Sequence, residues 1–214
     1  MKEYWRKMSL NDLFGIVLSE EKEKSRQAAR DVRKRIFSGG DRKSERGDLD
    51  RLIREAPKKY VDIAENWRRE NFVMAISVIY FLHDREDDPD FLFPWLLYLL
   101  EEKNGNIRQA AVRMIGNELG LLTVHIRFPN EKRDYSDLKP ANADLVLLRL
   151  FVSLHKIMQL HWKDSYERHK YIHTLPPSPY KSAQLLLRDM ERLCGEEYME
   201  ELDNKVIQAG EEMD

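Results

Sequence analysis

The chain has 214 residues, of which 42% are hydrophobic and 35% are charged, and its 36 Lys and Arg nearly balance its 38 Asp and Glu. A chain of this length can bury about 70% of the surface that it exposes when unfolded, which favours a single sizeable core. The one cysteine, Cys194, excludes a scaffold of internal disulfides and favours a reducing compartment, so we expect a cytoplasmic protein.

The longest apolar runs, 91–100 and 145–154, are interrupted by Pro94 and Arg149. A helix that crosses a bilayer needs about 20 predominantly apolar residues, so we expect no membrane span and no membrane partner. Residues 1–9 contain no apolar stretch with a cleavage site, so we also expect no signal peptide.

Apolar residues recur at helical spacing along most of the chain, which predicts an all-α fold of nine or ten helices. In chain order, the expected helices of the first half cover 10–18, 20–37, 49–56, 57–70 and 72–82. Ser9 is placed to cap the first of them. Pro57 is expected to begin a new helix, because proline fits the first helical turn. The segment 41–48 has no apolar residue, which predicts a mobile surface loop.

The expected helices of the second half cover 91–102, 107–119, 142–162, 179–194 and 196–209. Helical spacing lapses over 123–140, which predicts a long loop, and the alternation over 123–128 is compatible with extended backbone. The Pro-rich stretch 175–179 predicts a break, with Ser178 as the cap of the helix that Pro179 begins. We expect all of these helices to form one domain over 1–214.

Two stretches of the sequence suggest a repeat. Residues 71–82 align with residues 106–117 at an offset of 35, and each stretch follows another helix across a short turn. Helix pairs that recur every 20 to 50 residues or so are typical of an α-solenoid, in which each pair buries its apolar side against the next.

Residues 90–120 resemble a HEAT repeat. In that family the first helix carries a proline, an acidic residue follows eight positions later, and a valine–arginine pair opens the second helix. Pro94, Glu102, Ile107 and Arg108 occupy these places, with Glu for the usual Asp and Ile for the usual Val. The resemblance implies an α-solenoid of stacked antiparallel helix pairs, in which Glu102 and Arg108 belong to a charge ladder between neighbouring repeats. HEAT-like folds mostly serve as protein-binding scaffolds, and one branch comprises small DNA glycosylases.

The resemblance also implies a concave groove lined by the second helix of each pair, and we expect this groove to bind a protein partner. The candidate contact residues on the expected helix 107–119 are Arg108, Arg113 and Asn117. The sequence has no Walker loop, no G-x-G-x-x-G and no G-x-S-x-G motif, and Cys194 has no obvious histidine partner. We therefore expect a scaffold rather than an enzyme, without a cofactor.

The two ends of the chain differ in charge. Residues 26–46 contain eight cations and three anions, whereas residues 191–214 contain two cations and nine anions. The basic segment could bind nucleic-acid phosphates in the manner of the HEAT-like glycosylases, or it could be a solvated helix face. The candidate residues for this alternative are Arg30, Arg33, Lys34 and Arg35. The two ends could also attract each other, within one molecule or between copies, although a pI of about 6.3 argues against a dedicated nucleic-acid binder.

Four of the six histidines lie within residues 155–173. His169 and His173 are one helical turn apart, which is the spacing at which two imidazoles converge on a metal ion, and His161 and Glu167 could complete the site. No HExxH pattern accompanies them, so a metal-dependent hydrolase is a third hypothesis and a protein without a metal is the expectation.

Overall fold

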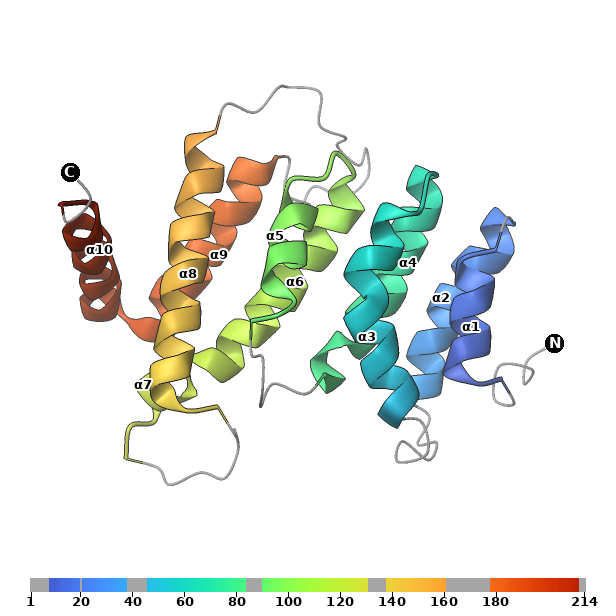
Figure 1. Cartoon of the computed structure of the whole chain (residues 1–214), viewed down its shortest axis with the longest axis horizontal. Helices are drawn as coiled ribbons and strands as arrows, with labels where there is room; N and C mark the ends of the chain where they lie inside the picture. Colours follow the sequence, from blue (N-terminus) through green and yellow to red (C-terminus); the bar gives the residue numbers. More distant parts are fainter. Residues whose placement is uncertain are drawn as a thin grey trace. The chain divides into compact units, whose positions relative to one another are not determined.

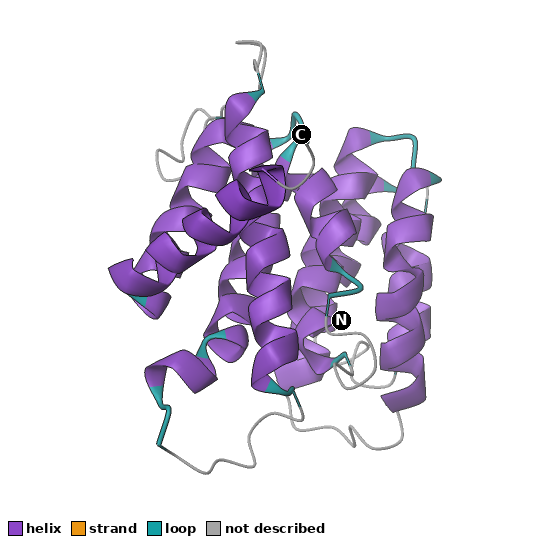
Figure 2. Cartoon of the chain, turned by 60° about the vertical axis from the view of Figure 1, so that its left-hand side comes forward, coloured by secondary structure: helices purple, strands orange, loops and turns teal. Residues whose placement is uncertain are grey.

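The structure is a computed structural model of the chain, and it describes residues 8–19, 21–37, 46–83, 90–130, 138–160 and 178–211. Within these ranges it contains helices and no strand, which confirms the predicted all-α class (Figure 2). The described residues form ten α-helices, as predicted, and one short 3₁₀-helix. The chain divides into two compact units, residues 1–84 and 85–214, so the expected single domain stays a prediction.

The first unit contains two helix pairs (Figure 1). α1 (Leu10–Val17) packs against α2 (Lys22–Phe37), and α3 (Arg46–Val61) packs against α4 (Asn66–Ile79), which η2 (Tyr80–Leu82) extends. Because short connections join the members of each pair, the paired helices run antiparallel. α2 also packs against α4, and α1 packs against α3 and α4, so the four helices enclose one core.

Apolar side chains from all four helices fill this core. Phe14 of α1 and Phe72 of α4 meet edge to face, with their ring centroids 6.1 Å apart. Both rings are almost completely buried, as are Val32 of α2 and Ile53 of α3. Burial of one such side chain contributes about 1.5–3 kcal/mol, so these contacts hold the two pairs together.

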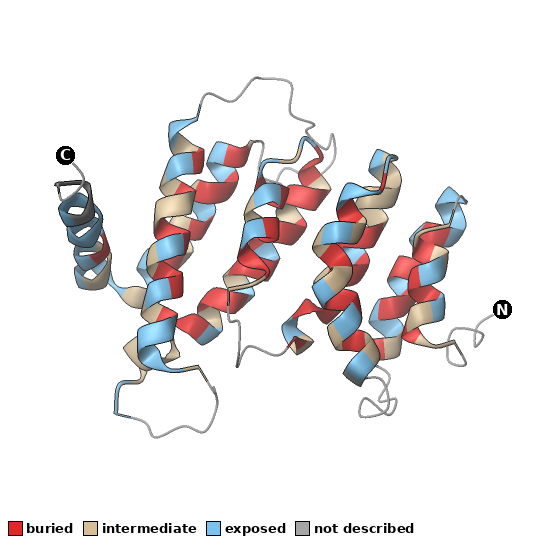
Figure 3. Cartoon of the chain, in the orientation of Figure 1, coloured by how far each residue is buried: buried red, intermediate tan, exposed pale blue. Residues whose placement is uncertain are grey.

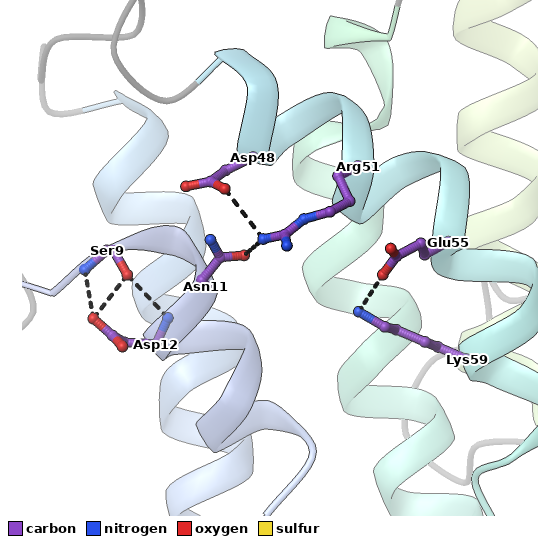
Figure 4. Close-up of polar contacts among 7 residues, drawn as sticks. All are labelled: Ser9, Asn11, Asp12, Asp48, Arg51, Glu55 and Lys59. Atoms are coloured by element: carbon purple, nitrogen blue, oxygen red, sulfur yellow. Dashed lines mark hydrogen bonds and ion pairs between the residues drawn. The ribbon is translucent and has the colours of Figure 1, made fainter.

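Polar contacts fix the start of α1 and its approach to α3 (Figure 4). The hydroxyl of Ser9 accepts a hydrogen bond from the backbone N–H of Asp12 at 3.1 Å, and the Asp12 carboxylate accepts one from the Ser9 backbone, which confirms the predicted cap. Hydrogen bonds from Ser9 hold the pKa of Asp12 below its ordinary value. Arg51 of α3 donates to Asn11 of α1 at 2.9 Å and to Asp48 at 3.1 Å.

The predicted helix boundary at Pro57 is wrong, because α3 continues through this residue to Val61. Proline lacks a backbone donor and its ring crowds the carbonyl of the preceding turn, which usually breaks a helix. Here Ile53, Ala56 and Tyr60, which flank Pro57, are fully buried. This continuous apolar face holds the helix together across the proline.

Two predicted loops are shorter than expected. α3 begins inside the predicted loop 41–48, of which residues 41–45 lie outside the described part of the chain. In the predicted loop 123–140, a short helix forms at α7 (Val124–Arg127), so the extended backbone expected over 123–128 is wrong. The helical turn lets the side chain of Arg127 donate to the hydroxyl of Thr123 at 3.1 Å, a contact that extended backbone does not allow.

The described residues of the second unit form six α-helices. Besides α7 they are α5 (Phe93–Leu100), α6 (Gly105–Leu122), α8 (Pro140–Gln159), α9 (Pro179–Cys194) and α10 (Glu196–Glu211). α6 and α9 form its centre, because α6 packs against α5, α7, α8 and α9, and α9 in turn packs against α8 and α10. Ser178 caps α9 and Pro179 begins it, as the sequence predicts, while residues 175–177 of the predicted break lie outside the described residues.

A single residue, Gly195, separates α9 from α10. Its backbone N–H donates to the carbonyl of Glu191 at 2.8 Å and closes α9. Its φ of +84° is a torsion that glycine adopts readily and other residues avoid. No other atom lies within 4 Å of the place where a Cβ would stand, so torsion rather than crowding selects glycine here.

α5 and α6 form the pair that resembles a HEAT repeat. Pro94 lies in the first turn of α5, and Ile107 and Arg108 lie in the first turn of α6. The alignment at an offset of 35 places Asn71 in the interior of α4 but Asn106 at the start of α6. The HEAT-like repeat and the solenoid therefore stay predictions.

Candidate partner-binding surfaces

Arg108, the first predicted contact residue, is fully buried. Its Nη1 atom donates to the backbone carbonyls of Glu102 and Lys103, at 2.6 and 2.7 Å. These carbonyls lie in the turn between α5 and α6, where the backbone has left the first helix and needs other donors. Arg108 therefore holds this turn and, being buried, does not lie on an accessible face.

Arg113 and Asn117 lie one turn apart on the exposed side of α6, and Leu121, 37% exposed, follows them on the same side. The opposite side of α6 is buried against its neighbours in the second unit. The structure thus places two of the three predicted contact residues on one accessible face. Their contact with a partner stays a prediction.

α2 carries residues 26–37 of the basic segment, and its packing against α1 and α4 divides these residues into two faces. The buried apolar residues of α2 are Ala28, Ala29, Val32 and Ile36. The other face exposes Arg26, Arg30 and Arg33 at positions i, i+4 and i+7, and Phe37 at i+11 is 65% exposed. We call these four residues the basic stripe. Since a helix rises about 1.5 Å per residue, the stripe is about 16 Å long.

The three arginines of the basic stripe are exposed. In the part of the chain that the structure describes, no carboxylate pairs with Arg26, Arg30 or Arg33. Lys34 differs, because its Nζ atom lies 2.7 Å from the Asp31 carboxylate. Arg35 lies on the other side of the helix and is half-buried. Two of the four residues predicted to bind phosphate therefore belong to the stripe, and Arg26, which was not a candidate, completes it.

A polar cluster in the second unit joins three helices. The Asp144 carboxylate of α8 lies 2.9 Å from Nε2 of His125 on α7 and accepts a hydrogen bond of 2.6 Å from Tyr198 of α10. This cluster could not be predicted from the sequence, because its members are 19 and 54 residues apart and belong to no motif. Cys194 is close enough for its pKa to respond to Asp144 and Arg127.

The pKa shifts of Asp144, Tyr198 and Cys194 indicate which groups of this cluster are ionised. Burial opposes the ionisation of Asp144, but hydrogen bonds from Tyr198 and His125 outweigh it and place its pKa below the ordinary value. Burial and the bond to Asp144 raise the pKa of Tyr198, so its hydroxyl stays protonated and donates. Burial raises the pKa of Cys194 to about 11, although Arg127 opposes the shift. A thiol in this state is a poor nucleophile. The hydrogen bonds of the cluster join α7, α8 and α10.

The predicted metal ligands His169 and His173, with His161 and Glu167, lie outside the described residues. Among the residues that are described, no group of three His, Cys, Asp or Glu side chains is placed to hold a metal ion. None of the described helices combines the length and the apolar character that a membrane crossing needs.

Comparison with known proteins assigns the chain to no family. No protein-family model, no curated protein and no solved structure matches the chain. The surfaces of the chain itself, above all the basic stripe, are therefore the observations from which a function can be inferred.

Proposed function

We propose that the protein is a non-enzymatic, cytoplasmic binding protein that uses the basic stripe to dock an acidic surface of a protein partner. The observation that carries this proposal is a row of three exposed arginines without carboxylate partners in the described part of the chain, followed by an exposed phenylalanine. Arginine and aromatic side chains supply much of the binding energy at protein interfaces. A guanidinium also binds carboxylates through two parallel hydrogen bonds, which favours an acidic partner.

Arg113 and Asn117 provide a second accessible face on α6, which fits the groove that the HEAT resemblance implies. This face carries a single charge, whereas the basic stripe carries three within about 10 Å of helix. The basic stripe is therefore the stronger anchor, and the α6 face is a candidate for additional contacts.

Nucleic acid is the second candidate partner, because the arginines of the basic stripe could also neutralise phosphates. Two features favour a protein instead. Phe37 ends the stripe with an exposed apolar group, and the chain as a whole has a pI of about 6.3.

The test is a triple charge reversal of the stripe, Arg26→Glu with Arg30→Glu and Arg33→Glu, in the full chain. The tagged variant and the wild type are used to capture proteins from a nuclease-treated extract of the native host, followed by quantitative mass spectrometry. We expect partners with acidic surfaces to be at least about tenfold depleted on the variant, because three attractive contacts become repulsive.

A matched control reverses three exposed cations elsewhere, Lys58→Glu, Lys156→Glu and Arg188→Glu, and should capture the same proteins as the wild type. Equal capture by the stripe variant would contradict the proposal. Fluorescence anisotropy with a labelled single strand and a labelled duplex, at two salt concentrations, tests the second candidate. Binding that weakens steeply with salt and is lost in the stripe variant would favour nucleic acid.

A further inference from the structure

α10 carries a stripe that matches the basic stripe in spacing and opposes it in charge. Leu202 anchors the buried side of α10, which packs against α8 and α9. The exposed side presents Glu196, Glu200 and Asp203 at positions i, i+4 and i+7, and Ile207 at i+11 is 58% exposed. We call these four residues the acidic stripe. Much of α10 is coloured as exposed in Figure 3.

The charges of the acidic stripe, like those of the basic stripe, have no ion-pair partner among the described residues. No cation within the described ranges pairs with Glu196, Glu200 or Asp203. Ile207 and Phe37 are among the most exposed large apolar side chains of the described chain, at 58% and 65%. Each stripe thus consists of three like charges and one apolar residue, in the same order along its helix.

The spacing of the two stripes is that of a helix–helix seam. Residues at i, i+4, i+7 and i+11 alternate steps of four and three, which keeps them facing a neighbouring helix that crosses at a shallow angle. Two helices packed in this way lie about 8–10 Å apart, a distance that arginine and glutamate side chains can bridge. Both stripes therefore have the geometry to meet along their full length of about 16 Å.

We propose that the basic stripe of one copy of the chain binds the acidic stripe of a second copy, with the two helices parallel. This inference deepens the proposed function and rests on it, because it names the acidic surface that the basic stripe docks. In the proposed contact Arg26 faces Glu196, Arg30 faces Glu200, Arg33 faces Asp203 and Phe37 faces Ile207.

Parallel orientation follows from the order of the residues. Run in the opposite direction, the same stripes would place Phe37 against Glu196 and Arg26 against Ile207. Both of these contacts would desolvate a charge against an apolar side chain without a partner. Only the parallel register gives three ion pairs and one apolar contact.

The contact joins different surfaces of the two copies, so each copy keeps one free stripe of each kind. Association of this type proceeds head to tail and produces a ring or an open chain. A contact along one helix is small, and its ion pairs are exposed, so we expect weak association that salt opposes.

Sedimentation equilibrium of the full chain at 50 and 500 mM NaCl, up to 200 µM protein, tests the contact. We expect the mass of the wild type to rise above 25.5 kDa with concentration and to fall again at the higher salt. The reversal of the basic stripe described above, and the reversal of the acidic stripe by Glu196→Arg, Glu200→Arg and Asp203→Arg, should each weaken association at least about tenfold.

The two variants also test each other. A mixture of them contains two attractive pairs of stripes, the wild-type pair and the pair with exchanged charges. A chain carrying all six substitutions contains the exchanged pair, so both samples should associate like the wild type. The control with Lys58→Glu, Lys156→Glu and Arg188→Glu should associate unchanged. Circular dichroism confirms that each variant keeps its helices.

Cross-linking tests the register. In a Cys194→Ala background, a chain with Phe37→Cys is mixed with a chain with Ile207→Cys and treated with a short bismaleimide that spans about 8 Å. We expect a product of twice the chain mass, and much less of it when Glu196→Cys replaces Ile207→Cys. The reverse preference would overturn the parallel register.

A wild type that stays monomeric at 200 µM and low salt, or that associates equally well after either reversal, would overturn the inference. A third chain carries both Phe37→Cys and Ile207→Cys. If the bismaleimide joins these cysteines only within one chain and never between copies, the inference is also overturned. The proposed function and this inference can fail independently of each other. The proposed function survives if a monomeric wild type still loses other acidic partners when the basic stripe is reversed, and it fails if that reversal changes neither capture nor association.

Discussion

Asp144 is the residue on which three helices of the second unit converge. Its carboxylate accepts the hydroxyl of Tyr198 at 2.6 Å and lies 2.9 Å from the imidazole of His125. Since Leu202 is the only fully buried apolar side chain among the described residues of α10, the hydrogen bond from Tyr198 is a large part of what holds that helix to α8.

We predict that Tyr198→Phe lowers the free energy of unfolding by about 1–2 kcal/mol, because it removes a hydrogen bond to a charged acceptor and leaves the ring in place. Urea unfolding monitored by circular dichroism measures the change. Tyr180→Phe, on an exposed ring, is the matched control and should change stability by less than about 0.5 kcal/mol.

The same substitution has a pH dependence with a defined sign. The folded-state pKa of Asp144 is lowered, so its ionised form stabilises the fold above its unfolded pKa of about 3.9, and this stabilisation is lost as the pH falls through the folded-state pKa. The difference between the wild type and Tyr198→Phe should therefore be constant above about pH 5 and shrink in stronger acid. A difference that grows as the pH falls would contradict this role of Asp144.

At the scale of single residues, the sequence predicted chemical types better than positions. It identified the basic segment of α2, but only packing against α1 and α4 decides that Arg26 is exposed with Arg30 and Arg33 while Arg35 is half-buried. It treated Arg108 as a surface residue, since charge normally excludes a side chain from the core. The two backbone carbonyls that satisfy Arg108 cannot be recognised from residue types.

At the scale of elements, predictions succeeded where local chemistry ends a helix. α9 has the predicted bounds, because Ser178, Pro179 and Gly195 act within one or two residues of its ends. Prediction failed at Pro57, where burial on both sides of the proline outweighs its preference for a helix start. It failed again over 123–128, where an alternating sequence forms α7.

Pro57→Ala should stabilise the protein. Alanine restores the backbone donor to α3 and removes the clash with the preceding turn, which together are worth up to about 3 kcal/mol in a helix interior. Proline also restricts the unfolded chain by about 0.4–1 kcal/mol, and alanine loses this benefit. We therefore expect a net gain of about 1–2 kcal/mol in the free energy of unfolding.

The midpoint of urea unfolding measures this gain, with Lys58→Ala as the control at the adjacent, exposed position of the same helix. A loss of stability in Pro57→Ala would show that α3 depends on a bend at this residue.

At the scale of the whole molecule, the two compact units differ in charge. Residues 1–84 contain 19 Lys and Arg against 15 Asp and Glu, whereas residues 85–214 contain 17 against 23. The sequence showed this asymmetry between its two ends, but composition and periodicity do not reveal which helices pack together.

Phe72→Ala should destabilise the first unit by about 3–5 kcal/mol, because it leaves a cavity beside Phe14. Hydrogen exchange with mass spectrometry should show faster exchange in α1 to α4 and little change in α5 to α10, since each unit has a core of its own. Leu96→Ala, in the core of the second unit, is the complementary variant and should give the opposite pattern. Equal acceleration everywhere in both variants would mean that the chain unfolds as one cooperative body.

The positive φ of Gly195 determines how α10 continues from α9. Without the change of direction there, residues 179–211 would tend to continue as one rod about 50 Å long. Tyr198 would then leave the place from which it reaches Asp144, and the carboxylates beyond it would point elsewhere. The direction of α10 is thus set at one position, by a backbone torsion that a residue without a Cβ adopts readily.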